Sequence, residues 1–173
     1  MDAAERRQEI IEYLKQNSQP VSASAIAARF SVSRQIIVGD IALLRAGNVR
    51  ISATPRGYIL TSHSGEENGL TRTIACKHSI ENLAQELYTI VDNGCGLLDV
   101  IVEHSVYGQI SGQLQIFSRY DADCFMEKLK QKNAMPLSDL TGGIHLHTLS
   151  CPSDTAYERI LFELKRKEIL LVK

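Results

Sequence analysis

The sequence contains no apolar run long enough to span a membrane, and its first residues carry mixed charge instead of the apolar core of a signal peptide. We therefore expect a cytoplasmic protein. Cysteine is scarce as well, and Cys76, Cys95, Cys124 and Cys151 lie far apart without forming a Cys-x-x-Cys pair. This spacing argues against a thiolate zinc knuckle or a dithiol redox motif, and it predicts free, mostly buried thiols.

The motifs of several enzyme classes are also missing: the chain has no glycine-rich phosphate loop, no nucleophile elbow and no carboxylate pair of the glycosidase type. Its 173 residues are 44% hydrophobic, which is enough to bury the core of one domain or of two small ones. Residues 1–60 hold eight of the 19 basic and five of the 20 acidic residues, a net charge of +3, and the remainder carries −4. Such an asymmetry suits a DNA-binding module joined to a sensor or oligomerisation domain.

Apolar spacing predicts three helices in the first part of the chain, over residues 3–16, 25–30 and 34–46. The last two are separated by the short corner Ser31-Val32-Ser33. This is the helix-turn-helix arrangement, in which the second helix enters the DNA major groove. Residues 49–60 then predict two short strands around a Pro-Arg-Gly turn, which is a wing.

The pattern Val-Ser-Arg-Gln-x-Ile-x-x-Asp-Ile-x-x-Leu-Arg-x-Gly, followed by Gly-Tyr-x-Leu, resembles the winged-helix domains of bacterial repressors of the biotin-repressor kind. The resemblance covers residues 1–60 and implies DNA binding; the alternative is a winged helix used only for protein contacts. Ser33, Arg34 and Gln35 begin the predicted helix, where side chains reach base edges and backbone N–H groups meet phosphate. Arg50 and Arg56 suit phosphate or minor-groove contacts from the wing.

Residues 61–69 are polar and form the expected linker, in which His63 stands alone with nothing nearby to hold it as a ligand. Beyond it, strands are predicted over 70–77, 97–102, 110–117 and around His145, and helices over 80–91, 122–132 and 155–166. The order β-α-β-β-α-β-α predicts a two-layer sandwich with helices on one side of a mainly antiparallel sheet. The fold class is therefore α+β, with the second domain spanning residues 70–173.

Two histidines on one predicted strand indicate a metal site. The strand period of two places His145 and His147 on the same face, and together they supply half of a metal site. His78 closes the strand 70–77, and Glu86 flanks the inward stripe of the next helix, where a carboxylate must find a partner or lie at the rim in water. Three imidazoles and a carboxylate suit zinc, nickel, iron(II) or manganese. The alternative is a strand with two partly exposed histidines.

Three segments carry a closer resemblance: Lys77-His78-Ser79, Glu103-His104-Ser105-Val106-Tyr107-Gly108 and Gly142-Gly143-Ile144-His145-Leu146-His147. With the winged helix, they resemble the niacin-responsive repressor family, which joins a winged helix-turn-helix to a three-histidine (3H) domain, over nearly the whole chain. The resemblance implies a phosphocarrier-like sensor domain, a homodimer, and a divalent metal held by His78, Glu86, His145 and His147. It also implies repression of NAD-synthesis and niacin-uptake genes when nicotinic acid is bound.

Two positions, Gly39 and Ser105, depart from the family pattern of a polar residue and a proline, so one DNA contact and the local shape of the pocket stay open. The carboxylate or ring nitrogen of nicotinic acid would complete the metal coordination, with His104 and Tyr107 as candidate pocket walls. Tyr107 equally suits an ordinary packed aromatic. Two other functions stay open: a regulator in which the metal itself is the signal, and a metal-dependent hydrolase, for which we find no well-placed general base.

Overall fold

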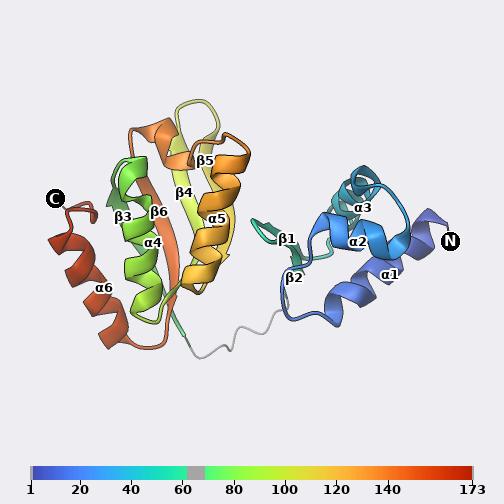
Figure 1. Cartoon of the computed structure of the whole chain (residues 1–173), viewed down its shortest axis with the longest axis horizontal. Helices are drawn as coiled ribbons and strands as arrows, with labels where there is room; N and C mark the ends of the chain where they lie inside the picture. The colour runs from blue at the N-terminus through green and yellow to red at the C-terminus, as the bar shows by residue number, and fades with distance from the viewer. Residues whose placement is uncertain (1, 62–68, 173) are drawn as a thin grey trace. The chain divides into compact units, whose positions relative to one another are not determined.

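The computed structural model describes residues 2–61 and 69–172 of the chain. The chain divides into two compact units, Met1–Gly65 and Glu66–Lys173, each with its own hydrophobic core (Figure 1). Most of the predicted linker, including His63, lies outside the described residues. No helix within the described ranges is long and apolar enough to cross a membrane.

The first unit is a winged helix. Its elements are α1 (Ala3–Lys15), α2 (Ala23–Phe30), α3 (Arg34–Ala46), β1 (Ile51–Thr54) and β2 (Gly57–Leu60). Each helix begins after a residue whose side chain accepts a backbone N–H of the first turn: Asp2, Ser22 and Ser33. Ile10, Ile26 and Ile37, one from each helix, are fully buried and pack in one core. The three predicted helices and the wing are therefore present.

Two ties orient α3 and the wing. Asp40, buried on the inner side of α3, accepts from Nε of Arg6 on α1 at 2.6 Å. The wing is joined to the loop before α2 by reciprocal backbone hydrogen bonds of 2.8 Å between Val21 and Tyr58. Gly57 makes this approach possible: its φ is +137°, and a Cβ there would lie 2.3 Å from the carbonyl oxygen of Val21.

The second unit is a two-layer α+β sandwich, as predicted. Its elements are β3 (Leu70–Lys77), α4 (Leu83–Asp92), β4 (Gly96–His104), β5 (Gly108–Ile116), α5 (Arg119–Gln131), β6 (Ile144–Cys151) and α6 (Asp154–Arg166), with short 3₁₀ turns at Ile80–Asn82 and Leu137–Thr141. The sheet order is β3-β6-β4-β5, and every pairing is antiparallel. The helices cover one face (Figure 1), and their buried side chains form one core with the inner face of the sheet.

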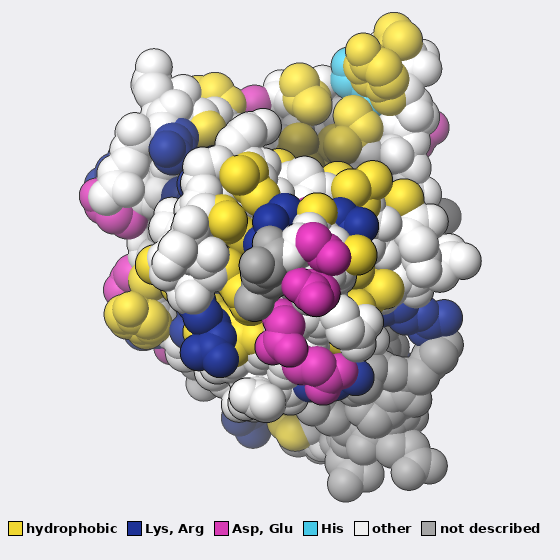
Figure 2. All heavy atoms as spheres, turned by 90° about the vertical axis from the view of Figure 1, so that its right-hand side faces the viewer, with side chains coloured by type: hydrophobic (Ala, Val, Ile, Leu, Met, Phe, Trp, Pro, Cys, Tyr) yellow, Lys and Arg dark blue, Asp and Glu magenta, His cyan; other side chains and the backbone are white. Residues whose placement is uncertain are grey.

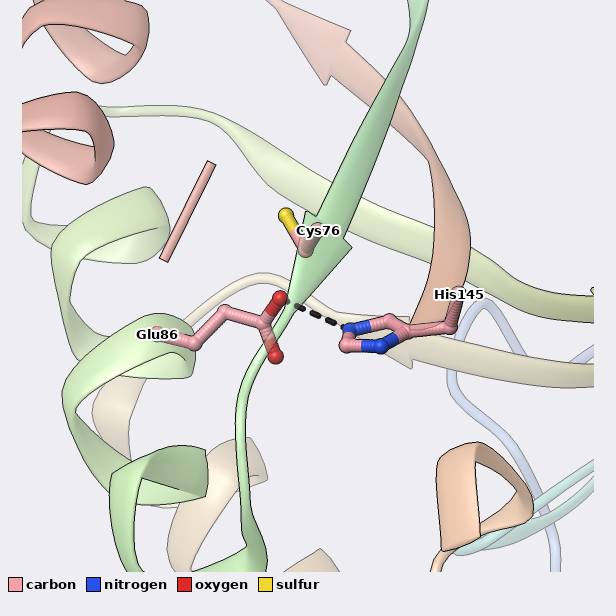
Figure 3. A group of neighbouring side chains, drawn as sticks. All are labelled: Cys76, Glu86 and His145. Carbon is pink, nitrogen blue, oxygen red and sulfur yellow. Dashed lines mark hydrogen bonds and ion pairs between the residues drawn. The ribbon is translucent and has the colours of Figure 1, made fainter. Parts of the chain in front are cut away.

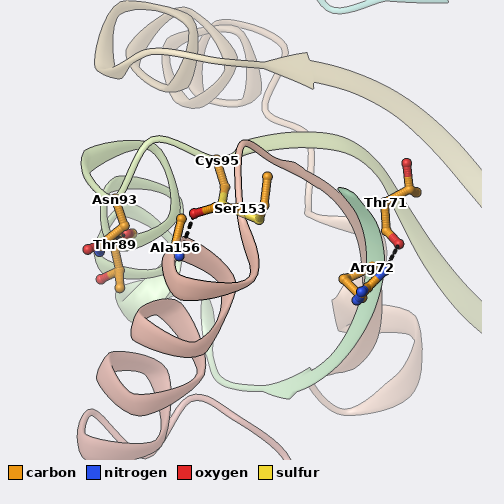
Figure 4. Close-up of a disulfide and its surroundings, with 8 residues drawn as sticks. Thr71, Arg72, Thr89, Asn93, Cys95, Ser153 and Ala156 are labelled. Atoms are coloured by element: carbon orange, nitrogen blue, oxygen red, sulfur yellow. Dashed lines mark hydrogen bonds between the residues drawn. A yellow bond between two sulfur atoms is a disulfide. The ribbon is translucent and has the colours of Figure 1, made fainter. Parts of the chain in front are cut away.

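The prediction of free cysteines is wrong for two of the four. Cys95 and Cys151 form a disulfide with their Cα atoms 4.4 Å apart (Figure 4). Cys76 and Cys124 are free. The reason is tertiary: β4 begins at Gly96, which pairs with Ser150 on β6, so the residues that flank this pair lie side by side. A sequence separation of 56 gave no sign of this contact.

Two glycine substitutions test the backbone of the first unit, one at the wing contact and one in α3. Gly57→Ala should lower the free energy of unfolding by about 1–3 kcal/mol, because alanine must adopt a φ that favours glycine and its methyl group meets the Val21 carbonyl. Gly39→Ala, in the middle of α3 with nothing within 4 Å of the added Cβ, should raise it by about 1 kcal/mol. Urea unfolding of the full chain measures both. An unchanged midpoint for Gly57→Ala would contradict the described wing geometry.

Candidate metal centre

Glu86 on α4 is completely buried, with 0% of its surface exposed, and three imidazoles surround its carboxylate. Nε2 of His78 lies 2.7 Å from Oε2, and Nε2 of His145 lies 2.9 Å from Oε1. Nε2 of His147 lies 3.4 Å from the same Oε1. The structure thus brings together the four residues singled out from the sequence.

This convergence required the two strand histidines to face the helices. The buried and exposed positions of β6 alternate, with His145 and His147 on the buried side and Ile144 and Leu146, 43% and 37% exposed, on the other. The inner side chains enclose a cavity of about 30 Å³ lined by Glu86 and all three histidines, which is room for one ion or one water.

The outer hydrogen bonds of the imidazoles determine which nitrogen faces the carboxylate. Nδ1 donates to a backbone carbonyl in each ring: to Ser79 from His78 at 2.7 Å, to Gly143 from His145 at 2.8 Å and to Asp99 from His147 at 2.7 Å. Because a carbonyl oxygen can only accept a hydrogen bond, each Nδ1 carries a proton. When the ring is neutral, its Nε2 therefore carries a lone pair and no proton. Such bonds orient histidines that ligate metals.

The centre of the cluster therefore lacks a positive partner when the rings are neutral. Three Nε2 lone pairs face a buried carboxylate, and Nε2 of His147 has no hydrogen-bond partner among the described residues. Burying these acceptors together is unfavourable unless protons or a cation lie between them. The donor set and the orphaned nitrogen both fit a divalent metal.

The pKa values point the same way. Burial raises the pKa of Glu86, but the charge and hydrogen bonding of the histidines outweigh it, so the pKa lies well below its usual value. Burial lowers the pKa of His78 and His147, but Glu86 outweighs it and both are raised. The buried carboxylate thus favours positive charge on the groups around it.

Cys76 is a neighbour that the sequence analysis missed. Its sulfur, a carboxylate oxygen of Glu86 and a ring nitrogen of His145 all lie within 4.8 Å of one another (Figure 3). Burial, followed by the charge of Glu86, raises the pKa of the Cys76 thiol, so it is neutral in the absence of a cation. The available signal was the strand period, which places Cys76 on the same side of its chain as His78.

The predicted effector residues lie in the turn between β4 and β5. Nδ1 of His104 accepts from the backbone N–H groups of Val106 and Tyr107 at 3.1 and 3.3 Å. The neutral ring therefore carries its proton on Nε2, the opposite tautomer to the cluster histidines. His104 lines an open cleft of about 990 Å³, and residues of β6, His145 among them, contribute to the same lining. Tyr107 is 78% exposed, which is not the packed aromatic considered from the sequence.

The predicted DNA contacts lie on the first unit. Arg34 and Gln35 are exposed in the first turn of α3, and the Ser33 hydroxyl caps the helix by accepting from the Ile36 N–H at 3.3 Å. Arg50 is exposed beside β1, whereas Arg56 at the wing turn lies 3.5 Å from the Gln19 side chain. The face drawn in Figure 2 mixes basic, acidic and hydrophobic side chains and shows no continuous basic patch.

A winged helix followed by a sandwich with a buried histidine cluster defines a two-domain, DNA-binding transcription regulator. Comparison with known proteins agrees: an HTH domain matches residues 6–59 and a 3H domain matches residues 71–173. The chain is 42% identical to the probable transcription repressor NiaR of Thermotoga maritima, over 96% of this chain and 94% of the relative. It is 38% identical to the transcription repressor NadR of Bacillus subtilis, over 97% and 94%.

The chain therefore belongs to the niacin-responsive repressor family. It is a transcriptional repressor and not an enzyme, because it carries an HTH domain and both relatives are named as transcription repressors over nearly their whole length.

Adjacent glycines allow a test of how the histidines are held. Gly143 has a φ of +94°, and a Cβ there would lie 2.4 Å from the carbonyl oxygen of His78, whereas Gly142 has a φ of +62° and open space around it. Both alanine variants carry backbone strain, but only Gly143→Ala must displace the His78 backbone. We expect NMR of the imidazoles to show shifted His78 and His145 resonances in Gly143→Ala alone. Equal shifts in both variants would contradict this account.

Proposed function

We propose that this repressor binds operator DNA of NAD-synthesis and niacin-uptake genes with nicotinic acid as co-repressor, sensed beside a divalent metal held by His78, Glu86, His145 and His147. The observation that carries the proposal is the convergence of three Nε2 atoms on a buried carboxylate, and an open cleft shares His145 with this cluster. A bound divalent ion would supply positive charge and open coordination positions for an anionic ligand.

The lining of the cleft includes the exposed carboxylate of Glu103, and it also has a donor and apolar groups suited to a flat ring. The Nε2–H group of His104 can donate a hydrogen bond to a carboxylate oxygen. Ile101 and Ile144 add apolar surface to the same lining. We assign His104 and Tyr107 to effector binding. The exposed ring of Tyr107 lies with its centroid 5.1 Å from that of His104, close enough to cover a bound ligand after a side-chain rotation.

Sensing requires a second conformation of the protein. An effector strengthens DNA binding only if it binds better to the arrangement that matches the operator. In the homodimer that we propose, that arrangement is the spacing of two copies of α3, which must match half-sites about one helical turn or a multiple apart. Ser33, Arg34, Gln35, Arg50 and Arg56 would then contact the DNA.

A regulator in which the metal itself is the signal would use the same cluster. The open cleft that shares His145 with the cluster has room for an organic effector. The two functions differ in what must be added before operator DNA is bound.

Fluorescence anisotropy with promoter DNA from an NAD-synthesis operon separates them. We expect tight binding only when metal and nicotinate are both present, and weaker binding with metal alone, with nicotinate alone or with nicotinamide. His104→Ala should lose the response to nicotinate and keep the zinc affinity of the wild type. Full binding with metal alone would support the metal-sensor alternative, and full binding by chelated protein with nicotinate would refute a role for the metal.

Substitutions in α3 test the DNA contacts. Arg34→Ala should weaken binding to all sequences and lower the slope of log affinity against log salt by about 1 if it contacts phosphate. Gln35→Ala should lose about 1–3 kcal/mol of discrimination at one base pair. Lys15→Ala removes a positive charge from α1 and serves as the control. Equal effects of Lys15→Ala and Arg34→Ala would contradict docking through α3.

A further inference from the structure

We infer that Cys76 is a further protein ligand of the proposed metal, and that its sulfur makes the site prefer zinc, nickel or cobalt over manganese. The inference rests on the proposed metal site. Neither the donor set predicted from the sequence nor the histidines that name the domain include a thiol.

Strand pairing places this thiol at the cluster. Cys76 on β3 is the direct partner of His145 on β6 in the antiparallel register. Side chains of such a pair project to the same face with Cβ atoms about 4.5–5.5 Å apart. Both residues face the helices, and Cys76 is 0% exposed.

The surroundings of the sulfur differ from those of an ordinary buried cysteine. A free cysteine in a core usually behaves as a small hydrophobic residue. Cys76 instead has a carboxylate oxygen of Glu86 and a ring nitrogen of His145 within 4.8 Å of its sulfur (Figure 3). Nε2 of His145 lies 2.9 Å from Oε1 of Glu86. Among the described residues, these three form a group whose ligand atoms all lie within 4.8 Å of one another, so the sulfur lies within the same cluster as two of the proposed metal ligands.

The donor chemistry predicts the metal preference. Sulfur, imidazole nitrogen and carboxylate oxygen are the three ligand types of protein zinc sites. A soft thiolate favours zinc and its neighbours, whereas manganese suits carboxylate, carbonyl and water. When the sulfur binds the ion, its S–H bond breaks, a sulfur–metal bond forms, and the proton leaves to the buffer.

The chain contains a matched control. Cys124 on α5 is the other free cysteine and is not part of the cluster, whereas Cys95 and Cys151 are joined in the disulfide. The Cys124→Ser variant therefore retains Cys76 as its one free thiol.

Cobalt absorption spectroscopy on the full chain tests the sulfur directly. We expect cobalt(II) to produce a near-ultraviolet sulfur-to-cobalt charge-transfer band in the wild type and in Cys124→Ser. The band should be absent from Cys76→Ser and Cys76→Ala, which should keep the visible ligand-field bands of bound cobalt. Because Cys124→Ser alone can show the band, the test does not depend on the folding of the Cys76 variants.

The outcomes separate this inference from the proposed function. Ligand-field bands without the charge-transfer band in Cys124→Ser would overturn the role of Cys76 and leave the histidine site standing. No cobalt spectrum in the wild type would overturn the metal site and the role of Cys76 together.

Competition between zinc and manganese tests the preference. Cys76→Ala should weaken zinc binding by at least about 10-fold, since even the loss of an outer-shell partner typically costs about 10- to 100-fold, and should leave manganese binding within about threefold of the wild type. Equal losses for the two metals would mean that Cys76 shapes the cavity by packing alone, which would overturn the preference.

Discussion

The contact between the buried carboxylate of Glu86 and three imidazoles is the interaction on which the second unit depends. A fully buried carboxylate is costly unless hydrogen bonds and opposite charge compensate it. In this chain the compensation comes from three imidazoles that lie eight, 59 and 61 positions away in the sequence. The sheet must hold β6 against α4 for the group to form, so packing of this unit and construction of the site are one requirement.

The strand order meets this requirement. Because β6 lies between β3 and β4, its histidines can be oriented from both sides. On one side, the Asp99 carbonyl accepts from His147, and the Asp99 carboxylate accepts from the Thr148 N–H at 2.9 Å, near an irregularity in the β4–β6 pairing. On the other side, β3 brings Cys76 opposite His145. A strand at the edge of the sheet would have only one such neighbour.

In the first unit, the contacts hold α3 in place so that its outer side stays exposed. Caps begin the helices, isoleucines fill the core, and the Arg6–Asp40 contact ties α1 to the inner side of α3. The outer side of the helix is thereby left to Arg34 and Gln35. The first unit thus presents an exposed helix face, and the second unit encloses a polar, titratable interior.

Apolar periodicity and capping residues are signals between residues close together in the chain. The sequence by itself therefore determined the features that depend on such neighbours. It predicted helix 34–46 and strand 70–77 with the bounds that the structure has, the α+β class, and the shared face of His145 and His147. Only the tertiary structure decided the disulfide and the place of Cys76 beside Glu86. The physical reason is that these depend on strand order and register, which are set by packing between residues far apart in the chain.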